Sequence, residues 1–302
     1  MSKYLAALTC LFLVACQPEP AAETAQPAEP QPGAESQPVA QVDPLDAALA
    51  AQSDEARARY AYRHPRETLE FFGVEPGMTV VEGLPGSGWY TRILLPYLGS
   101  EGRLVGADYS MDMWRLFDFA TDEFLAGQAN WVTSFPADAQ GWAGEDAASV
   151  TAFTFGDMPA DIAGTADVVL MIRALHNLAR FSGGERDFLG EAFADAYAAL
   201  KPGGVLGVVQ HQAGEEMPDD FADGSHGYLK KSRVIAAAQQ AGFELVAESD
   251  LNANPKDQPS EDDIVWRLPP TLGTSAENPE LRAELEAIGE SNRMTLKFRK
   301  PE

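Results

Sequence analysis

The chain has 302 residues, of which 45% are hydrophobic and 23% charged, and this is enough for one large domain with its own core. Its 46 acidic and 22 basic residues give a formal charge of -24, so nucleic acid and anionic membrane surfaces should repel the protein. Both cysteines, Cys10 and Cys16, lie near the N-terminus, which excludes a disulfide framework or a cysteine metal site in the remainder.

The N-terminal segment has the features of a targeting signal. Lys3 precedes an apolar run at residues 5–15, which is shorter than the ~20 residues that a spanning helix needs. Leu13-Val14-Ala15-Cys16 resembles a bacterial lipobox, which implies an exported lipoprotein with a lipid on Cys16 as its sole membrane anchor. Gln17 directly follows this cysteine and would be the second residue of the mature lipoprotein, which favours the outer membrane, with the domain facing the periplasm. The alternative is an ordinary signal peptide with an incidental cysteine.

Composition divides the chain into three parts. We expect a signal peptide at residues 1–15, a linker at 16–45 and one folded domain at 46–302. The linker is rich in Pro, Ala, Glu and Gln, and it has too few large apolar side chains to offset its chain entropy.

The domain alternates helix-like segments with apolar strands. Residues 46–74 predict one or two helices, with Pro65 suited to a first helical position and Gly73 to a helix end. Seven strands are expected within residues 77–83, 102–110, 149–159, 166–178, 203–212, 242–250 and 294–301. Further helices are expected within residues 186–204, 232–242 and 278–289. This alternation is typical of a doubly wound, Rossmann-like α/β domain with a mostly parallel sheet.

The turn after the first strand has an unusual composition. Residues 80–91, VVEGLPGSGWYT, run from two valines and an acid into a glycine-rich turn and then into a helix. Glycines in such a turn let the backbone approach a ligand beyond the carboxyl end of the strand. Pro85 fixes φ and removes a donor, so this turn should be stiffer than most.

This turn resembles the first motif of class I S-adenosylmethionine-dependent methyltransferases, in which an acid precedes G-x-G-x-G. Leu84 stands at the first glycine position, while Gly86 and Gly88 keep the other two. About residues 57–300 also resemble a narrower bacterial group of exported methyltransferases. The segments that carry this resemblance are PG-x-GWYT at 85–91, His176-Asn177, ANP-x-D at 253–257 and IGES-x-RMTLKF at 288–298.

The resemblance implies a seven-stranded sheet whose last strand is antiparallel, and S-adenosylmethionine as the cofactor. The cofactor residues that it implies are the loop residues Gly86, Ser87 and Gly88, with Glu82 near the amino group, Asp108 on the ribose hydroxyls and Asp157 near the adenine. The methyl group of a sulfonium is already activated, so the protein mainly has to position the reactants.

The methyl acceptor should be a small molecule bound near the same strand ends. Candidates for acid–base or positioning roles are His176 and then His211, and an acting His176 would titrate near ~6.5, shifted by burial and by surrounding acids. Candidates for acceptor binding are Arg173, Asn177, Trp89 and Tyr90. We expect His176, Asn177 and His211 to face one pocket. Core packing is an equal alternative for Trp89 and Tyr90, each histidine can be purely structural, and no metal-ligand spacing is recognisable.

Two other functions compete with methyl transfer. A dinucleotide-binding oxidoreductase needs G-x-G-x-x-G, but Thr91 stands where the third glycine would be. A non-catalytic binding module on a methyltransferase scaffold is the second alternative, because S-adenosylmethionine is made in the cytoplasm and a lipoprotein folds outside it.

Overall fold

The computed structural model describes residues 42–302, so the expected signal peptide, Cys16 and linker residues 17–41 lie outside it. The first helix, α1 (Pro44–Ala50), begins two residues before the expected start of the domain. The Asp43 carboxylate accepts from the backbone N–H of Leu45 at 2.8 Å, and Pro44 occupies the first turn, which together start a helix. None of the helices between residues 42 and 302 is long and apolar enough to cross a membrane.

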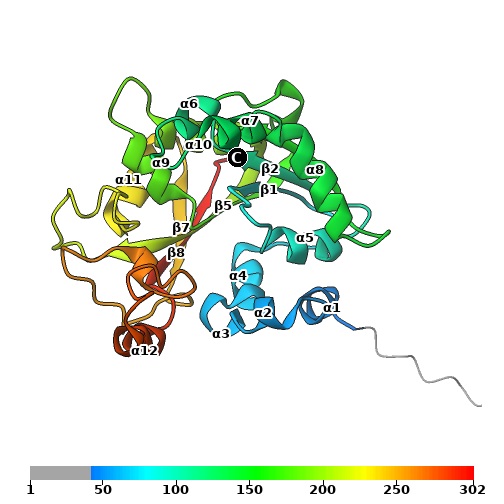
Figure 1. Cartoon of the computed structure of the whole chain (residues 1–302). Helices are drawn as coiled ribbons and strands as arrows, with labels where there is room; N and C mark the ends of the chain where they lie inside the picture. The colour runs from blue at the N-terminus through cyan, green and yellow to red at the C-terminus, as the bar shows by residue number, and fades with distance from the viewer. Residues whose placement is uncertain (1–41) are drawn as a thin grey trace, which may run out of the picture. The chain divides into compact units, whose positions relative to one another are not determined.

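One mostly parallel sheet forms the centre of the domain (Figure 1). Its strand order is β3-β2-β1-β4-β5-β8-β7, and β8 runs antiparallel to both β5 and β7. The strands are β1 (Thr79–Gly83), β2 (Arg103–Asp108), β3 (Ser149–Thr154), β4 (Ala166–Ile172), β5 (Leu200–Ala213), β7 (Glu244–Ser249) and β8 (Arg293–Arg299). The expected seven strands and the antiparallel last strand are confirmed. The two-residue strand β6 (Leu229–Lys230) pairs with β5 and is too short for a sequence pattern to reveal.

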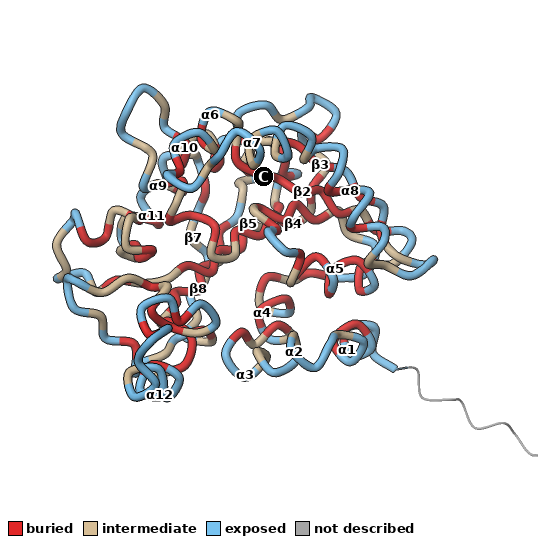
Figure 2. The backbone as a smooth tube through the Cα atoms, viewed as in Figure 1, coloured by how far each residue is buried: buried red, intermediate tan, exposed pale blue. Residues whose placement is uncertain are grey.

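Two layers of helices cover the sheet because successive strand residues point to opposite faces. Val80 and Leu104 pack into one core with the first of these layers, whereas Val81 and Val105 pack into a second core on the other face. The first layer contains α1, α4 (Pro65–Phe72), α5 (Thr91–Leu98) and α8 (Trp131–Trp142), and the second contains α9 (Leu175–Phe181), α10 (Phe188–Ala199) and α11 (Lys231–Gln240). Figure 2 shows the central strands buried and the outer sides of these helices exposed.

The segment before β1 forms four short helices instead of the expected one or two. Between α1 and α4 lie α2 (Asp54–Arg57) and α3 (Tyr60–Arg63). Ser53 accepts from Ala56 N and starts α2, while His64 has a left-handed φ of 41° and ends α3 directly before Pro65. The short helices α6 (Met111–Trp114) and α7 (Asp122–Gln128) follow β2.

A long excursion between β7 and β8 folds back over the sheet edge and contains η2 (Val265–Arg267) and α12 (Pro279–Ile288). The buried carboxylate of Asp257 fixes it, accepting from the Tyr228 hydroxyl at 3.2 Å and from Arg267 Nη2 at 2.9 Å. The backbone N–H of Asn292 donates to the same carboxylate at 2.9 Å. These bonds hold residues 265–271 and 290–293 beside the carboxyl ends of the central strands.

Candidate functional site

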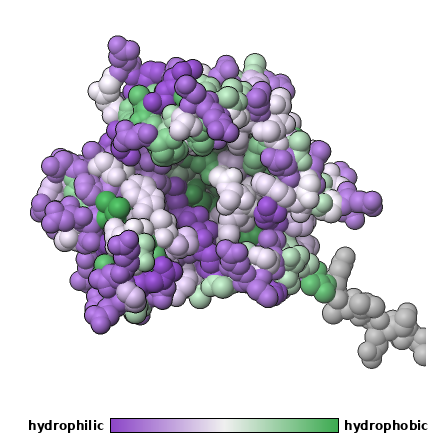
Figure 3. Space-filling view, in the orientation of Figure 1, coloured by the Kyte–Doolittle hydropathy of each residue, from purple (hydrophilic) through white to green (hydrophobic). Residues whose placement is uncertain are grey.

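A cavity of about 630 Å³ lies beyond the carboxyl ends of β1, β2 and β4, and we refer to it as the Asp108 cavity. Ligands bind at this edge in open α/β sheets, and here it is the point where the strand order reverses between β1 and β4. Its lining includes Leu84, Gly86, Asp108, Tyr109, Trp114 and His176. Figure 3 shows the molecule hollowed near the centre of one face.

The glycine turn places its backbone against this cavity. Leu84, Gly86 and Gly88 all have left-handed backbone, with φ of 54°, 57° and 79°. A Cβ on Gly86 would meet only Leu84 O, at 3.9 Å, whereas a Cβ on Gly88 would lie 2.3 Å from the Trp142 ring. Leu84 therefore has a left-handed backbone that glycine adopts without strain, at a cost of ~1–2 kcal/mol.

Asp108 supplies the acidic group of the cavity. It ends β2, is 7% exposed, and its Oδ1 accepts from the backbone N–H of Tyr109 at 2.8 Å. Burial raises the pKa of Asp108 to about 7, against the lowering effects of the bonds from Tyr109 and Trp114. No Lys, Arg or His among the described residues pairs with this carboxylate, so it has capacity to accept further hydrogen bonds.

Three of the expected cofactor residues, Glu82, Gly88 and Asp157, do not line the cavity. Glu82 is buried in β1 and accepts from the Thr91 hydroxyl at 2.7 Å, and burial raises its pKa to about 7. Asp157 is exposed in the turn after β3, where the neighbouring Gly156 N–H donates to Asp195 of α10. In this structure Glu82 links β1 to α5 through Thr91, and Asp157 lies outside the walls of the cavity.

A second cavity of about 370 Å³ adjoins the glycine turn on its other side, and we refer to it as the arginine cavity. Its polar lining includes Arg59, Arg63, Arg173, His176, His211 and Ser291. The opposite wall comes from residues 265–271 of the excursion after β7 and includes Trp266. The two cavities share Leu84, Gly86, Ser87, Arg173 and His176, so they adjoin along these residues.

His176 and His211 meet in the arginine cavity. Their ring centroids lie 5.5 Å apart, and His211 Nδ1 forms a 2.5 Å hydrogen bond with Ser291 Oγ. His176 lies in the first turn of α9, and His211 lies within β5, two residues before its end at Ala213. Asn177 instead lines the Asp108 cavity, where its Nδ2 donates to the Tyr109 hydroxyl at 3.2 Å. No one cavity is lined by all three residues: His176 and His211 share the arginine cavity, and His176 and Asn177 share the Asp108 cavity.

The environment of these histidines is basic, not acidic. Burial lowers the pKa of His176 to about 4, and the positive charge of Arg173 acts in the same direction. Burial likewise holds the pKa of His211 well below its ordinary value. The expected shift by burial is the largest effect and takes the pKa of His176 far below ~6.5, whereas the expected influence of acids is wrong, because the charged groups that act on this imidazole are arginines.

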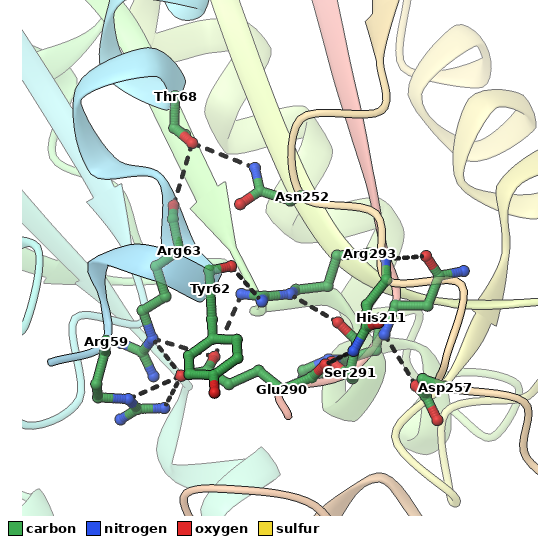
Figure 4. Close-up of polar contacts among 12 residues, drawn as sticks. Arg59, Tyr62, Arg63, Thr68, His211, Asn252, Asp257, Glu290, Ser291 and Arg293 are labelled. Atoms are coloured by element: carbon green, nitrogen blue, oxygen red, sulfur yellow. Dashed lines mark hydrogen bonds and ion pairs between the residues drawn. The ribbon is translucent and has the colours of Figure 1, made fainter. Parts of the chain in front are cut away.

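Three arginines surround the single carboxylate of Glu290, which lines the arginine cavity (Figure 4). Glu290 accepts from Arg59 Nε at 2.8 Å and from Arg63 Nε at 3.2 Å, and Arg293 Nη1 lies 3.4 Å from it. Arg293 also donates to the carbonyl of Tyr62 at 2.7 Å, which ties β8 to α3. The segment 288–298 thus supplies Glu290, Ser291 and Arg293 to one cluster.

Trp89 and Tyr90 lie at the start of α5 with different environments. Tyr90 is buried in the core between the sheet and α5, whereas Trp89 lines the arginine cavity with Arg63 4.5 Å above its ring. Core packing therefore accounts for Tyr90. Sequence reasoning did not identify Arg59, Arg63, Glu290 or Ser291 as site residues, although the last two lie in a segment that it had singled out.

No group of three or more His, Cys, Asp or Glu residues suited to a metal ion is found within residues 42–302.

Comparisons with known proteins lead to one class. No family model matches the sequence. Over 187 residues the chain is 25% identical to a ubiquinone/menaquinone biosynthesis C-methyltransferase of Hydrogenovibrio crunogenus, covering 61% of this chain and 63% of the relative. The chain thus spans less than two thirds of that relative's length.

Solved structures with similar folds include a SAM-dependent methyltransferase from Aquifex aeolicus, at 12% identity and a TM-score of 0.46, with 85% of this chain and 98% of that chain covered. Another is the geranyl diphosphate C-methyltransferase of Streptomyces coelicolor, at 14% identity and a TM-score of 0.46, with 84% and 87% covered. The fold of the domain, defined by its own strand order, is that of class I methyltransferases. The sequence relative is a methyltransferase, the activity that the motif at residues 80–91 predicted.

Proposed function

We propose that the protein is an S-adenosylmethionine-dependent methyltransferase that acts on a small-molecule acceptor. The observation that carries this proposal is the pair of cavities that share one wall at Gly86, Arg173 and His176. A two-substrate transfer needs two adjoining sites whose reactive groups meet, and this arrangement provides them. The methyltransferase named above, similar over 187 residues, supports the same activity.

The residues of the Asp108 cavity fit this cofactor. A buried carboxylate without a cationic partner among the described residues matches the paired hydroxyls of a ribose, which donate hydrogen bonds. Gly86 leaves its backbone open toward the cavity, and a side chain there would occupy the same space. Trp114 and Tyr109 add an aromatic wall against which an adenine can stack.

When bound, S-adenosylmethionine would supply the methyl group: an oxygen or nitrogen lone pair of the acceptor would form the new bond to carbon, the carbon–sulfur bond would leave its electrons on sulfur, and the acceptor proton would pass to water. His176 lies at the shared wall and is neutral at pH 7, since its pKa is about 4. A neutral imidazole of such low basicity is suited to accepting a hydrogen bond from the acceptor and orienting it. His176 thus acts mainly in positioning, with His211 held by Ser291 behind it.

The location of this activity is part of the proposal. A lipid on Cys16 would tether the domain to a membrane on the periplasmic side, as the lipobox-like segment at residues 13–16 favours. A full chain with Cys16→Ser should then lose its lipid. Mass spectrometry of the N-terminal peptide of the wild-type protein, isolated from membranes, measures the modification of Cys16. An unmodified Cys16 in that peptide would contradict this proposal.

Isothermal titration of the purified full chain tests the proposed activity class. S-adenosylmethionine should bind at one site per chain, and NADH should not bind. The converse result would favour the oxidoreductase alternative. Binding without any methyl transfer to small-molecule extracts, followed with a labelled methyl group, would favour a binding module.

A further inference from the structure

The arginine cavity has more positive charge than its own residues neutralise. The guanidinium groups of Arg59, Arg63, Arg173 and Arg293 cluster around one carboxylate, Glu290, which leaves a formal excess of three positive charges. Glu290 is the one carboxylate that contributes appreciably to the charge environment of Arg63, Arg173 and Arg293. Such clustering is unexpected in a chain with a formal charge of -24.

Arg173 is the least satisfied of these groups. Its backbone has a left-handed φ of 58° and its N–H donates to Val209 O at 2.6 Å, so β5 holds the residue in place. No described residue accepts a hydrogen bond from its buried Nε. The Nδ1 atom of His176, a residue that is 7% exposed, is likewise buried without a partner among residues 42–302.

Burial lowers the pKa of two of these arginines. It lowers the pKa of Arg63 to about 9 and that of Arg173 to about 10, with neighbouring arginines acting in the same direction. Both groups remain charged at pH 7. Burying uncompensated charge costs several kcal/mol per ion, and a cluster of this kind is stabilised when a counter-charge enters.

We infer that the methyl acceptor is an anion whose carboxylate or phosphate group lies among Arg59, Arg63 and Arg173. This inference rests on the proposed function, because it assigns the arginine cavity to the acceptor. Guanidinium groups bind both kinds of oxyanion through paired, charge-assisted hydrogen bonds.

The remaining walls define the rest of the acceptor. They are largely apolar, with Trp89, Ile172, Val265, Trp266, Leu268 and Pro270 facing the cavity. A volume of about 370 Å³ lies at the small end of ligand pockets. An acceptor with one anionic end and a compact apolar or aromatic body fits this lining.

The cofactor has a carboxylate of its own, and this gives a competing explanation for part of the cluster. Gly86, Ser87 and Arg173 line both cavities, so the methionine end of the cofactor can approach the arginines. One carboxylate still leaves two of the three excess charges unmatched. The two explanations differ in whether an added anion binds while the cofactor site is full.

The experiment titrates anions into the full chain saturated with S-adenosylhomocysteine. The probes are acetate, benzoate and inorganic phosphate, with acetamide and benzamide as neutral partners of the two carboxylates, all measured by isothermal titration calorimetry. At least one anion should bind, and a carboxylate should bind about 10-fold or more tighter than its amide. Absence of any anion preference would overturn the inference, and so would anion binding that S-adenosylhomocysteine abolishes.

Three variants locate the binding. Arg63→Gln should weaken anion binding about 10- to 100-fold, the range of a lost charge-assisted bond. Arg59→Gln removes a more exposed partner, with its side chain 21% exposed, and keeps the test valid if Arg63→Gln does not fold. Arg282→Gln is the matched control, because that side chain is 50% exposed on α12 and pairs with Glu286. Equal losses in all three variants would contradict a site in the arginine cavity.

Binding of S-adenosylmethionine to the same samples separates this inference from the proposed function. Cofactor binding without an anion preference would support the proposed methyltransferase function and contradict the inference that the acceptor is an anion. An anion preference without cofactor binding would contradict the proposed function and leave an anion-binding site.

Discussion

The ring of His176 lies 5.5 Å from that of His211, although 35 positions separate them in the chain. The first ring comes from α9 directly after β4, and the second from β5, which pairs with β4 in parallel. Adjacent parallel strands lie ~4.8 Å apart, so side chains at the same edge of this pair meet. His176 lines both cavities and His211 lines the arginine cavity, which gives the pair a place in the proposed transfer.

His176 should titrate far below the ordinary range of an imidazole. Burial and Arg173 lower its pKa to about 4, so in the folded protein it stays neutral until the pH falls to that value. Proton NMR of the imidazole C–H signals across pH 3.5–8 measures this, with His176→Gln identifying the signal. A midpoint near ~6.5 would contradict the buried, basic environment described above.

The same residue should affect turnover more than cofactor binding. His176→Ala removes the imidazole from the shared wall but leaves Asp108 in place, so affinity for S-adenosylmethionine should change less than about 3-fold. Turnover of an acceptor should fall about 10-fold or more, because that group orients the acceptor. Calorimetry and a labelled-methyl assay give the two numbers. Full turnover in the variant would remove the positioning role.

Glu82 should make the stability of the protein depend on pH. Burial raises its pKa from 4.5 to about 7, so between these values the folded protein binds more protons than the unfolded chain. The free energy of unfolding therefore falls as pH rises through this window, and the loss is complete above about pH 7. Glu82→Gln should raise the stability by ~1–3 kcal/mol at pH 8, and much less at pH 4.5.

Urea unfolding at the two pH values measures this difference. Glu67→Gln, on the exposed side of α4, is the control and should show no change between them. An equal effect of Glu82→Gln at both pH values would mean that the carboxyl group is already ionised in the folded protein.

The two glycines of the turn should respond differently to alanine. Both have left-handed backbone, so each substitution costs ~1–2 kcal/mol in backbone strain. The Gly88→Ala methyl group would also lie 2.3 Å from the Trp142 ring, whereas at Gly86 the nearest atom is 3.9 Å away. Overpacking should therefore add ~1–3 kcal/mol to the cost of Gly88→Ala. Thermal unfolding measures both, and equal losses would show that Trp142 does not press on this turn.

Glu290 should matter more for stability than an exposed glutamate on the same side of the domain. Glu290→Gln leaves the buried guanidinium groups of Arg59, Arg63 and Arg293 without their carboxylate, which should cost ~3–5 kcal/mol. Glu286→Gln, about half exposed on α12, is the control and should cost under ~1 kcal/mol. Urea unfolding measures both, and similar values would mean that water already screens the cluster.

The strands and the glycine turn could be predicted because their signals are local. Val80, Val81, Leu104 and Val105 form apolar runs between turn residues, and the acid–glycine pattern at residues 82–88 needs a window of seven positions. The four short helices of residues 44–72 were harder, because single capping residues such as Ser53 and His64 decide where each one ends.

The arginine cavity could not be predicted because tertiary contacts create it. Arg59 and Glu290 are 231 positions apart, and no periodic pattern links them. The same contacts explain the failure of the expected His176 titration. The chain is strongly acidic overall, yet the charged groups that act on this buried imidazole are Arg173 and Arg180. Average composition therefore indicated the wrong sign for the local charge.

The cofactor assignment is the central claim, and Asp108 is the residue that tests it most directly. Titration calorimetry of the full chain with S-adenosylmethionine should give one site per chain, and Asp108→Ala should weaken it by ~1.5–3 kcal/mol through a lost charge-assisted bond. Asp161→Ala, an exposed residue outside both cavities, should leave the affinity unchanged. Wild-type affinity should also rise with pH through about 7 as Asp108 ionises. Unchanged affinity in Asp108→Ala would contradict the account.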